Sequence, residues 1–338
     1  RHVNQLPKKY IEKLPPFTLQ RINEMKPAIE ANQKFFDAVI EQVDKSKIFI
    51  SNDQRSRKSR SKFVQSHDAS KVRTTLRQCV RDWSLEGKKE RDECYGLIIS
   101  ELQKILPLED SDLNKKSVLV PGAGLGRLAL EIAILGYATQ GNEFSYHMLF
   151  TSGLLLNSAA ENQFTIYPYI DDTCNNINWG DMVRGIKIPD IDTEVVLSDV
   201  KSKLPNGEEL NFSMTAGEWI EIYKNQLESW DCVITCFFLD TAPVAMDYIE
   251  TIHNILKLGG RWINFGPLQF HWANSGPDPR YEESIELSWE EMRHVIASSG
   301  FEIVKEEQRT TSYNSNIKSM LKTEYTAIFF TAQKVANK

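Results

Sequence analysis

The sequence predicts an α/β fold in which a mostly parallel sheet is covered by helices on both faces and preceded by a helical N-terminal region. Up to about residue 107 the apolar residues recur at helical spacing, whereas from Ser117 short β-branched segments alternate with helical ones. Such alternation favours a parallel sheet. Two consecutive strand-like segments, 301–308 and 325–334, indicate an antiparallel hairpin at one edge. We therefore expect a helical region at 1–110 and an α/β domain at 111–338.

Three helical segments are expected in the N-terminal region. In the first, 18–46, Pro27 is expected to break or to start the helix, because proline lacks the backbone N–H. The second, 68–84, places Gln78 and Arg81 three positions apart, away from its apolar face. These two side chains are either solvated or reach a shared ligand. The third segment runs from 89 to 106 and ends before Pro107.

The α/β part is read as strand and helix in turn. Gly136 is expected to end the first helix, and Ser288 with Glu291 forms a capping box before the last one. The polar stretch 171–211 fits insertion loops better than core. The expected strands after the first, 117–121, are 137–143, 164–170, 231–240 and 261–267, with helices at 127–135, 148–162, 244–260 and 288–300.

Composition limits the class of protein. The 338 residues are 41% hydrophobic and carry a formal net charge of −6, which argues against bulk nucleic-acid binding despite the basic run 55–62. No apolar stretch is long enough for a membrane helix, and residues 1–10 lack the apolar core of a secretory signal. The five cysteines show no paired C-x-x-C spacing, so neither a disulfide framework nor a metal site is expected. A cytoplasmic protein is the expectation, with a nuclear location left open.

A glycine-rich turn follows the first strand of the α/β part. Gly122 and Gly124 allow the backbone to bend and to approach a ligand at the carboxyl end of the sheet. A dinucleotide fingerprint, G-x-G-x-x-G, would place a third glycine at position 127, where Arg127 stands instead. The third glycine is Gly126, and this G-x-G-x-G spacing resembles motif I of class I S-adenosylmethionine-dependent methyltransferases.

Two acids accompany the turn. Glu143 ends the second strand, 21 residues after Gly122, where a carboxylate accepts hydrogen bonds from ribose hydroxyls. Glu218 lies where these methyltransferases place an acid on the adenine amino group, and Trp219 beside it is expected to pack on the adenine ring. The alternative for Glu218 is an acid that stabilises a helix N-terminus.

Two further polar residues follow buried strands at the carboxyl edge of the sheet. Asp240 closes the run "CVITCFFLD" and is expected to hold an amine or imidazole N–H. The alternative is an N-cap for the helix that starts near Pro243. His271 follows the next strand and is expected to contact substrate, with aromatic packing as its alternative. Tyr313 and Tyr325 flank the entry to the last strand; each either bonds a substrate carboxylate or is a strand-edge tyrosine.

Five segments in order resemble the carnosine N-methyltransferase family: "VLVPGAGLGRLALEIA", "GNEFSYHMLF", "NFSMTAGEW", "WDCVITCFFLDTA" and "WINFGPLQFHW". The resemblance spans about residues 70–334. It implies a Rossmann-like class I methyltransferase with a seven-stranded, mostly parallel sheet and an antiparallel last strand. It also implies methyl transfer from S-adenosylmethionine to the imidazole pros nitrogen of carnosine, a histidine-containing dipeptide, giving anserine and S-adenosylhomocysteine, with no metal.

The resemblance assigns roles by position. It places the N-terminal region, 1–110, as a lid over the cofactor. The substrate contacts are Asp240, His271, Tyr313 and Tyr325, of which Asp240 and His271 are catalytic. The implied cofactor contacts are Gln78, Arg81, Gly122, Gly124, Arg127, Glu143, Glu218, Trp219 and Cys236. Two features depart from the expected pattern: Glu218 stands where aspartate is expected, and the segment 270–283 is longer than usual, which leaves substrate specificity open.

Three alternatives remain at this stage. The first is the same chemistry on a histidine within a protein or in another small molecule. The second is a nicotinamide-dependent oxidoreductase, which Arg127 disfavours. The third is a noncatalytic scaffold, which the polar pocket residues disfavour. Neither a nucleic acid nor a membrane is an expected partner, and homodimerisation is left open.

Overall fold

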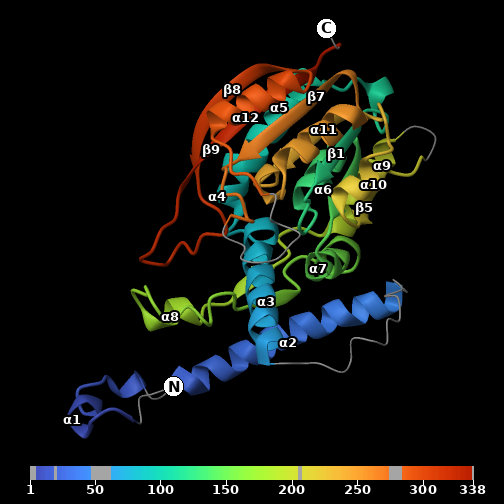
Figure 1. The fold of residues 1–338 in the computed structure, drawn as a ribbon. Helices are drawn as coiled ribbons and strands as arrows, with labels where there is room; N and C mark the ends of the chain where they lie inside the picture. The colour runs from blue at the N-terminus through green and yellow to red at the C-terminus, as the bar shows by residue number, and fades with distance from the viewer. Residues whose placement is uncertain (1–4, 19–20, 47–61, 205–207, 274–283, 337–338) are drawn as a thin grey trace.

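A seven-stranded sheet organises the molecule (Figure 1). The computed structural model describes residues 5–18, 21–46, 62–204, 208–273 and 284–336. The strand order is β5-β2-β1-β6-β7-β9-β8; the first five of these pair in parallel, and β9 is antiparallel to both β7 and β8. This confirms the predicted fold class. The strands are β1 (Ser117–Pro121), β2 (Ala138–Glu143), β5 (Phe212–Ala216), β6 (Trp230–Cys236), β7 (Leu256–Gly266), β8 (Phe301–Thr311) and β9 (Tyr325–Lys334).

Helices cover both faces of the sheet. A small antiparallel sheet of β3 (Phe164–Ile166) and β4 (Ile186–Ile188) lies apart from the main one. Three short 3₁₀ turns are η2 (Pro16–Thr18), η5 (Asp110–Asp112) and η7 (Leu239–Thr241), and η4 (Asp92–Gly96) is a π-helix. The α-helices are α1 (Lys8–Ile11), α2 (Arg21–Ser46), α3 (Lys62–Trp83), α4 (Lys88–Arg91), α5 (Leu97–Ile105), α6 (Arg127–Ile134), α7 (Tyr146–Asn157), α8 (Trp179–Met182), α9 (Thr193–Lys203), α10 (Trp219–Tyr223), α11 (Ala245–Ile255) and α12 (Trp289–Ser298).

Three local expectations are wrong. The segment 164–170 is not the third strand of the main sheet; β3 pairs with β4, and the edge position belongs to β5, which directly follows the polar stretch 171–211. Pro27 neither starts nor breaks the helix, because it lies inside α2. The predicted helix 244–260 ends at Ile255, and Gly259 and Gly260 belong to β7. By contrast, the capping box of Ser288 and Glu291 is confirmed.

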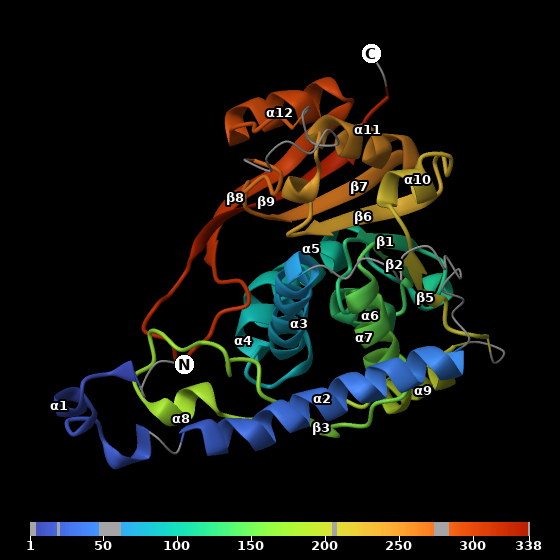
Figure 2. The same cartoon turned by 60° about the horizontal axis from the view of Figure 1, so that its bottom comes forward.

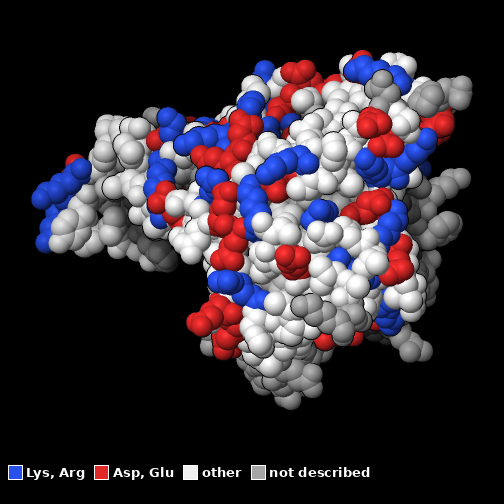
Figure 3. Space-filling view, turned by 90° about the horizontal axis from the view of Figure 1, so that it is seen from above, with Lys and Arg blue, Asp and Glu red and all other residues white. Residues whose placement is uncertain are grey.

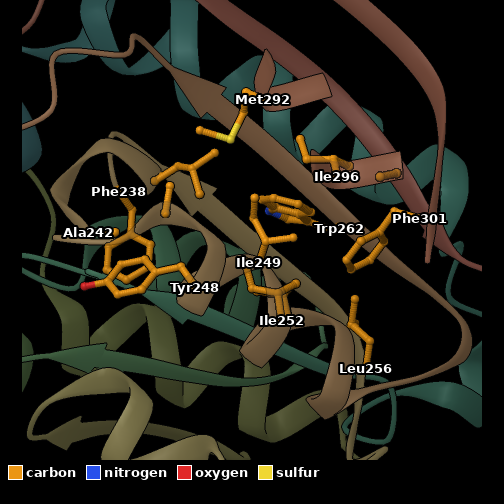
Figure 4. Packing of buried hydrophobic residues seen from close by; sticks show 14 of the residues in the cluster. Phe238, Ala242, Tyr248, Ile249, Ile252, Leu256, Trp262, Met292, Ile296 and Phe301 are labelled. Atoms are coloured by element: carbon orange, nitrogen blue, oxygen red, sulfur yellow. The ribbon is translucent and has the colours of Figure 1, made fainter. Parts of the chain in front are cut away.

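The core alternates across the sheet, as the period-2 geometry of strands requires. On one face Trp262 of β7 packs against Ile249 and Ile252 of α11 and Met292 of α12 (Figure 4). On the other face Val120 and Ile234 pack against α5 and α6. At the site end of the first face, Phe238 stacks on Tyr248, with ring centroids 4.8 Å apart. The apolar core thus reaches the carboxyl edge of β1 and β6.

The N-terminal helices lie on the α7 side of the molecule (Figure 2). The long helix α2 packs along α7 and β3, while α3 packs against α4, α7 and β4. Phe35 of α2 and Trp83 of α3 belong to one buried cluster with residues of α7. The C-terminal half of α3 is therefore fixed near the glycine turn. Helix α1, in contrast, lies away from the sheet, beyond the N-terminal end of α2 (Figure 1).

The surface mixes charges of both signs. In the face shown in Figure 3, lysines and arginines lie beside acidic residues. The edge strand β8 has the same character, since Lys305 and Arg309 both pair with Glu307. Residues 55–61 of the basic run lie outside the described part of the chain. Within the described residues no helix is long and apolar enough to cross a membrane.

Candidate active site

The glycine turn between β1 and α6 has the backbone that its sequence predicts. Gly122, Gly124 and Gly126 have φ of 65°, 56° and 81°, which side chains rarely allow. A Cβ at Gly122 would lie 2.3 Å from the Phe238 ring, so the turn rests directly on the core. At Gly124 the nearest atom to such a Cβ is Nε2 of Gln78, at 3.6 Å. The turn therefore lies between the core and α3.

Glu143 closes this turn from the end of β2. Its carboxylate accepts hydrogen bonds from the backbone N–H of Gly124 at 2.9 Å, Phe144 at 2.9 Å and Ser145 at 2.8 Å. Burial raises the pKa of Glu143 above its usual value of 4.5, although these three hydrogen bonds oppose the rise. The structure thus places a desolvated carboxylate beside the glycines, where a ribose is expected.

The Arg127 side chain points to the N-terminal region. Its guanidinium donates to the backbone oxygen of Asp82 at 3.0 Å, to Asp190 and to Glu131, and lies over the Trp83 ring. These contacts join α6 to α3. A cofactor contact through the Arg127 side chain is not what this geometry favours; its backbone N–H, in the first turn of α6, stays a predicted contact.

The second acid and its neighbour occupy the start of α10. The Glu218 carboxylate accepts the N–H of Glu221 at 2.8 Å, so the N-terminal role weighed for this residue is realised. One capping bond leaves acceptor capacity on a carboxylate. Trp219 is buried and packs against Tyr223, Phe238 and Tyr248. Contact of these two residues with an adenine stays a prediction.

Gln78 and Arg81 are buried, which excludes the solvated alternative. Gln78 donates to Asp82 at 2.8 Å, and Arg81 donates to Asp82 at 3.0 Å and to the Tyr95 hydroxyl at 2.7 Å. The π-helix η4 supplies Tyr95 and also Cys94, whose sulfur accepts from Arg81 at 3.4 Å. π-Helical turns are frequent at functional sites. Here Cys94 and Tyr95 of η4 form the wall of the candidate site behind Arg81.

Cys236 ends β6 beside this wall. A hydrogen bond with the Cys94 thiol, together with burial, raises the pKa of the Cys236 thiol. Cys236 therefore stays a neutral thiol. Its sulfur lies at the carboxyl end of the central strand, next in the chain to Phe237, whose ring is 5.6 Å from the Arg81 guanidinium.

Asp240 and His271 lie side by side. Asp240 is 2% exposed, and its Oδ2 accepts the backbone N–H of Gln269 at 2.9 Å. The backbone N–H of His271 in turn donates to the backbone oxygen of Asp240 at 2.9 Å. Burial raises the pKa of Asp240, opposed by the Gln269 hydrogen bond and by the neighbouring His271. The N-cap alternative for Asp240 is wrong, since Val244 is the N-cap of α11.

The two tyrosines lie at the two ends of the connection between β8 and β9, Tyr313 two residues after β8 and Tyr325 as the first residue of β9. The Tyr313 hydroxyl donates to Gln78 at 3.2 Å, and the Tyr325 hydroxyl accepts from the Gln269 amide at 3.3 Å. Phe237 lies between them, with ring centroids 4.4 Å from Tyr313 and 6.4 Å from Tyr325. Phe237 has φ of 52°, a conformation that is rare for a bulky residue and is often found at functional sites.

These contacts form one continuous path. It leads from Glu143 through the glycine turn to Gln78, then through Tyr313, Phe237, Tyr325 and Gln269 to Asp240 and His271. Sequence reasoning missed Phe237 and Gln269, although both stand within two residues of a predicted site residue. It also missed Asp82 and Glu90, which no motif marks.

Comparison with known proteins gives a consistent result. Residues 58–336 match the family described as Carnosine N-methyltransferase. A Mus musculus protein of that name is 42% identical over 338 residues, which is 99% of this chain and 80% of the mouse protein. A Schizosaccharomyces pombe protein of the same name is 43% identical over 263 residues, 75% of this chain and 68% of that protein.

Among solved structures, an S-adenosylmethionine-dependent methyltransferase from Methanosarcina mazei is 14% identical with a TM-score of 0.43. The match covers 71% of this chain and 98% of that one. The sheet order and the sequence relatives, rather than this distant likeness, define the fold and the family.

Proposed function

The chain belongs to the carnosine N-methyltransferase family, and from this premise we propose that it methylates the imidazole pros nitrogen of carnosine with S-adenosylmethionine, forming anserine. The observation that carries the proposal is the continuous path of contacts from the glycine turn to Asp240 described above. It sets a nucleotide-type turn beside a buried carboxylate suited to an imidazole N–H. That pairing fits methyl transfer to a histidine side chain.

The residues around the turn fit the cofactor. The Gln78 amide faces Gly124, and the Glu143 carboxylate is fixed by three backbone N–H groups while keeping lone pairs for two ribose hydroxyls. Glu218 and the Trp219 backbone lie at the next strand end, where an adenine would be held. The Arg81 guanidinium and the first N–H groups of α6 would hold the amino-acid part. The C-terminal half of α3 would then act as a lid.

When bound, S-adenosylmethionine supplies an electrophilic methyl group on a sulfonium. The chain must bind the imidazole in its neutral form and present the correct nitrogen. Near neutral pH much of a free imidazole is already neutral, so orientation is the larger task for the protein. Near-attack positioning of this kind lowers barriers by several kcal/mol.

Asp240 is suited to fix the tautomer. We infer that its carboxylate accepts the N–H of the imidazole nitrogen remote from the methyl group and stabilises the cation that forms. Gln269 holds this carboxylate in place, and His271 lies beside it. Tyr313 and Tyr325 would bind the termini of the dipeptide, and Phe237 would pack against its ring.

A direct assay tests the proposal. The purified chain is incubated with methyl-labelled S-adenosylmethionine and carnosine, and the product is identified by nuclear magnetic resonance. We expect label on the pros nitrogen of the dipeptide. A parallel incubation uses cell extract in place of carnosine. Label found only on a protein band of that extract, or only on a different histidine-containing small molecule, would replace carnosine as the acceptor. Label on neither would overturn the proposed activity.

A further inference from the structure

A buried carboxylate outside every predicted contact links the two halves of the site. Glu90 of α4 is 8% exposed, and acidic residues are rarely so buried without a task or partners. Its Oε1 accepts the backbone N–H of Asn314 at 2.9 Å, and its Oε2 accepts that of Ser315 at 3.3 Å. Oε1 also lies 2.8 Å from Nε of Arg81. One side chain thus joins α3 to a segment more than 220 residues away.

The segment concerned, residues 312–315, leaves β8 and carries Tyr313. Two successive backbone N–H groups, with Asn314 at a φ of 52°, converge on the Glu90 carboxylate. Such a concave pair of N–H groups binds anions, and here the anion is a side chain of the protein itself. The Ser312 hydroxyl lies 3.5 Å from the same carboxylate. The position of the 312–315 segment therefore depends on Glu90.

The orientation of Tyr313 follows from this anchor. Its hydroxyl donates to Oε1 of Gln78, and the Asn314 amide donates to the same oxygen at 3.0 Å. Its ring lies 4.7 Å from the Arg81 guanidinium. Gln78 is oriented in turn by its hydrogen bond to Asp82. Glu90, Arg81 and Gln78 are thus all in contact with the 312–315 segment. Among them, Glu90 is the residue of α4 that holds the segment in place.

We propose that Glu90 is a positioning residue for the methyl transfer: its carboxylate holds the 312–315 segment so that Tyr313 faces the acceptor substrate. The inference rests on the proposed function, in which Tyr313 contacts the dipeptide. Arg81 also keeps Asp82 and Tyr95 as partners, so the cofactor side of the wall has support independent of Glu90. Loss of Glu90 should therefore disturb the acceptor side first.

The test is Glu90→Gln. Glutamine keeps the size and one acceptor oxygen but turns an NH₂ group toward one of the two N–H donors. Losing such a charge-assisted bond should raise KM for carnosine about tenfold or more. The Kd for S-adenosylhomocysteine should change by less than about threefold. Glu90→Asp keeps the charge beside Arg81 but is too short to reach both N–H groups, so the same shift is expected and can be measured if the glutamine variant does not fold.

Glu101→Gln is the matched control. Glu101 is 5% exposed and bonds Lys305 at 2.8 Å and Thr331 at 3.2 Å, away from the site. This control should lower the melting temperature and leave KM unchanged. A double-mutant cycle with Tyr313→Phe completes the test, because a shared pathway predicts strongly non-additive effects.

An unchanged KM in the Glu90 variants, an equal loss of cofactor affinity, or additive effects with Tyr313→Phe would each overturn the positioning role. The proposed function fails separately, if the unmodified chain does not methylate carnosine. Comparison of the variants with the unmodified chain therefore keeps the two failures distinct.

Discussion

At the scale of single residues, the site is a set of carboxylates in different surroundings. Glu143 and Asp240 are both desolvated, and the pKa of each is raised. Glu143 is surrounded by three backbone N–H donors, whereas the Asp240 side chain accepts the N–H of Gln269 and lies beside His271. The surroundings suit Glu143 to hydroxyl donors and Asp240 to an N–H that gains positive charge.

Replacing Asp240 with asparagine tests its role in the chemical step. Asparagine keeps an oxygen for the Gln269 N–H, so the local fold should persist, but the negative charge is lost. We expect kcat to fall by about 10²- to 10⁴-fold, while the Kd for S-adenosylhomocysteine stays within about twofold. Steady-state kinetics and calorimetry give the two numbers. An Asp240→Asn enzyme with ordinary kcat would remove Asp240 from the mechanism.

Cofactor affinity should depend on pH through Glu143. Ribose hydroxyls donate to the ionised carboxylate, so binding favours that form and releases a proton wherever the free protein holds Glu143 protonated. Because burial raises its pKa above 4.5, affinity should weaken as pH falls through that raised value. Calorimetry of S-adenosylhomocysteine between about pH 7 and pH 5, in buffers of different ionisation enthalpy, measures the released proton. Glu143→Gln should bind more weakly and without this dependence; an unchanged proton release would assign it to another group.

At the scale of elements, α3 is the piece that joins the helical region to the turn. The Trp83 indole N–H donates to the backbone oxygen of Leu125 at 3.2 Å, inside the glycine turn. Arg127 adds the contacts from α6 to Asp82 and Trp83. The turn is therefore held from both sides, by Phe238 of the core and by α3.

Trp83→Phe should weaken cofactor binding, although Trp83 is not itself a predicted cofactor contact. The change leaves the Leu125 oxygen unpaired and opens space, so we expect about 1–3 kcal/mol of lost stability and a several-fold higher Kd for S-adenosylhomocysteine. Trp262→Phe is the matched control: Trp262 is also fully buried and donates to Thr235 at 2.8 Å, within the core. Equal changes in Kd for the two variants would show that only global stability matters.

The sequence predicts most of the main sheet but not all of its edges. The predicted strands 117–121 and 231–240, which correspond to β1 and to β6 (Trp230–Cys236), are largely apolar runs, and apolar runs are typical of buried parallel strands. The edge strand β5 is half exposed along its length, so its apolar signal is weak and β3 was expected in its place. Proline inside α2 shows a similar limit, because packing on α7 outweighs the missing hydrogen bond.

The residues of the candidate site likewise divide into those that the sequence predicts and those that it does not. Residues at a strand end, such as Glu143, or a few residues after one, such as Asp240, are predictable because parallel strands bring their carboxyl ends to one edge. Glu90 is not predictable in this way, because its role depends on the backbone N–H groups of the 312–315 segment, which reach α4 only in the folded chain. No local pattern records a contact between segments more than 220 residues apart.

At the scale of the whole molecule, the first and last thirds of the chain meet over the middle one. Helix α3 covers the glycine turn, and the connection between β8 and β9 crosses from the sheet to α4 and on toward α8, where Met320 bonds Asn175 (Figure 1). Ligands bound at the turn would contact segments that are distant in sequence. Binding should therefore stabilise those segments together.

Hydrogen exchange can measure this coupling in two steps. S-adenosylhomocysteine alone should protect residues 76–83 and the turn at 122–127, and at about a hundredfold excess over Kd it adds about 2.7 kcal/mol to the free energy of unfolding. Carnosine added next should extend protection to 312–315, since that segment carries Tyr313. Helix α12 packs on β8 and carries no predicted ligand contact, so it serves as the internal reference. Protection confined to the strands of the sheet at both steps would mean that neither α3 nor the 312–315 segment closes over the ligands.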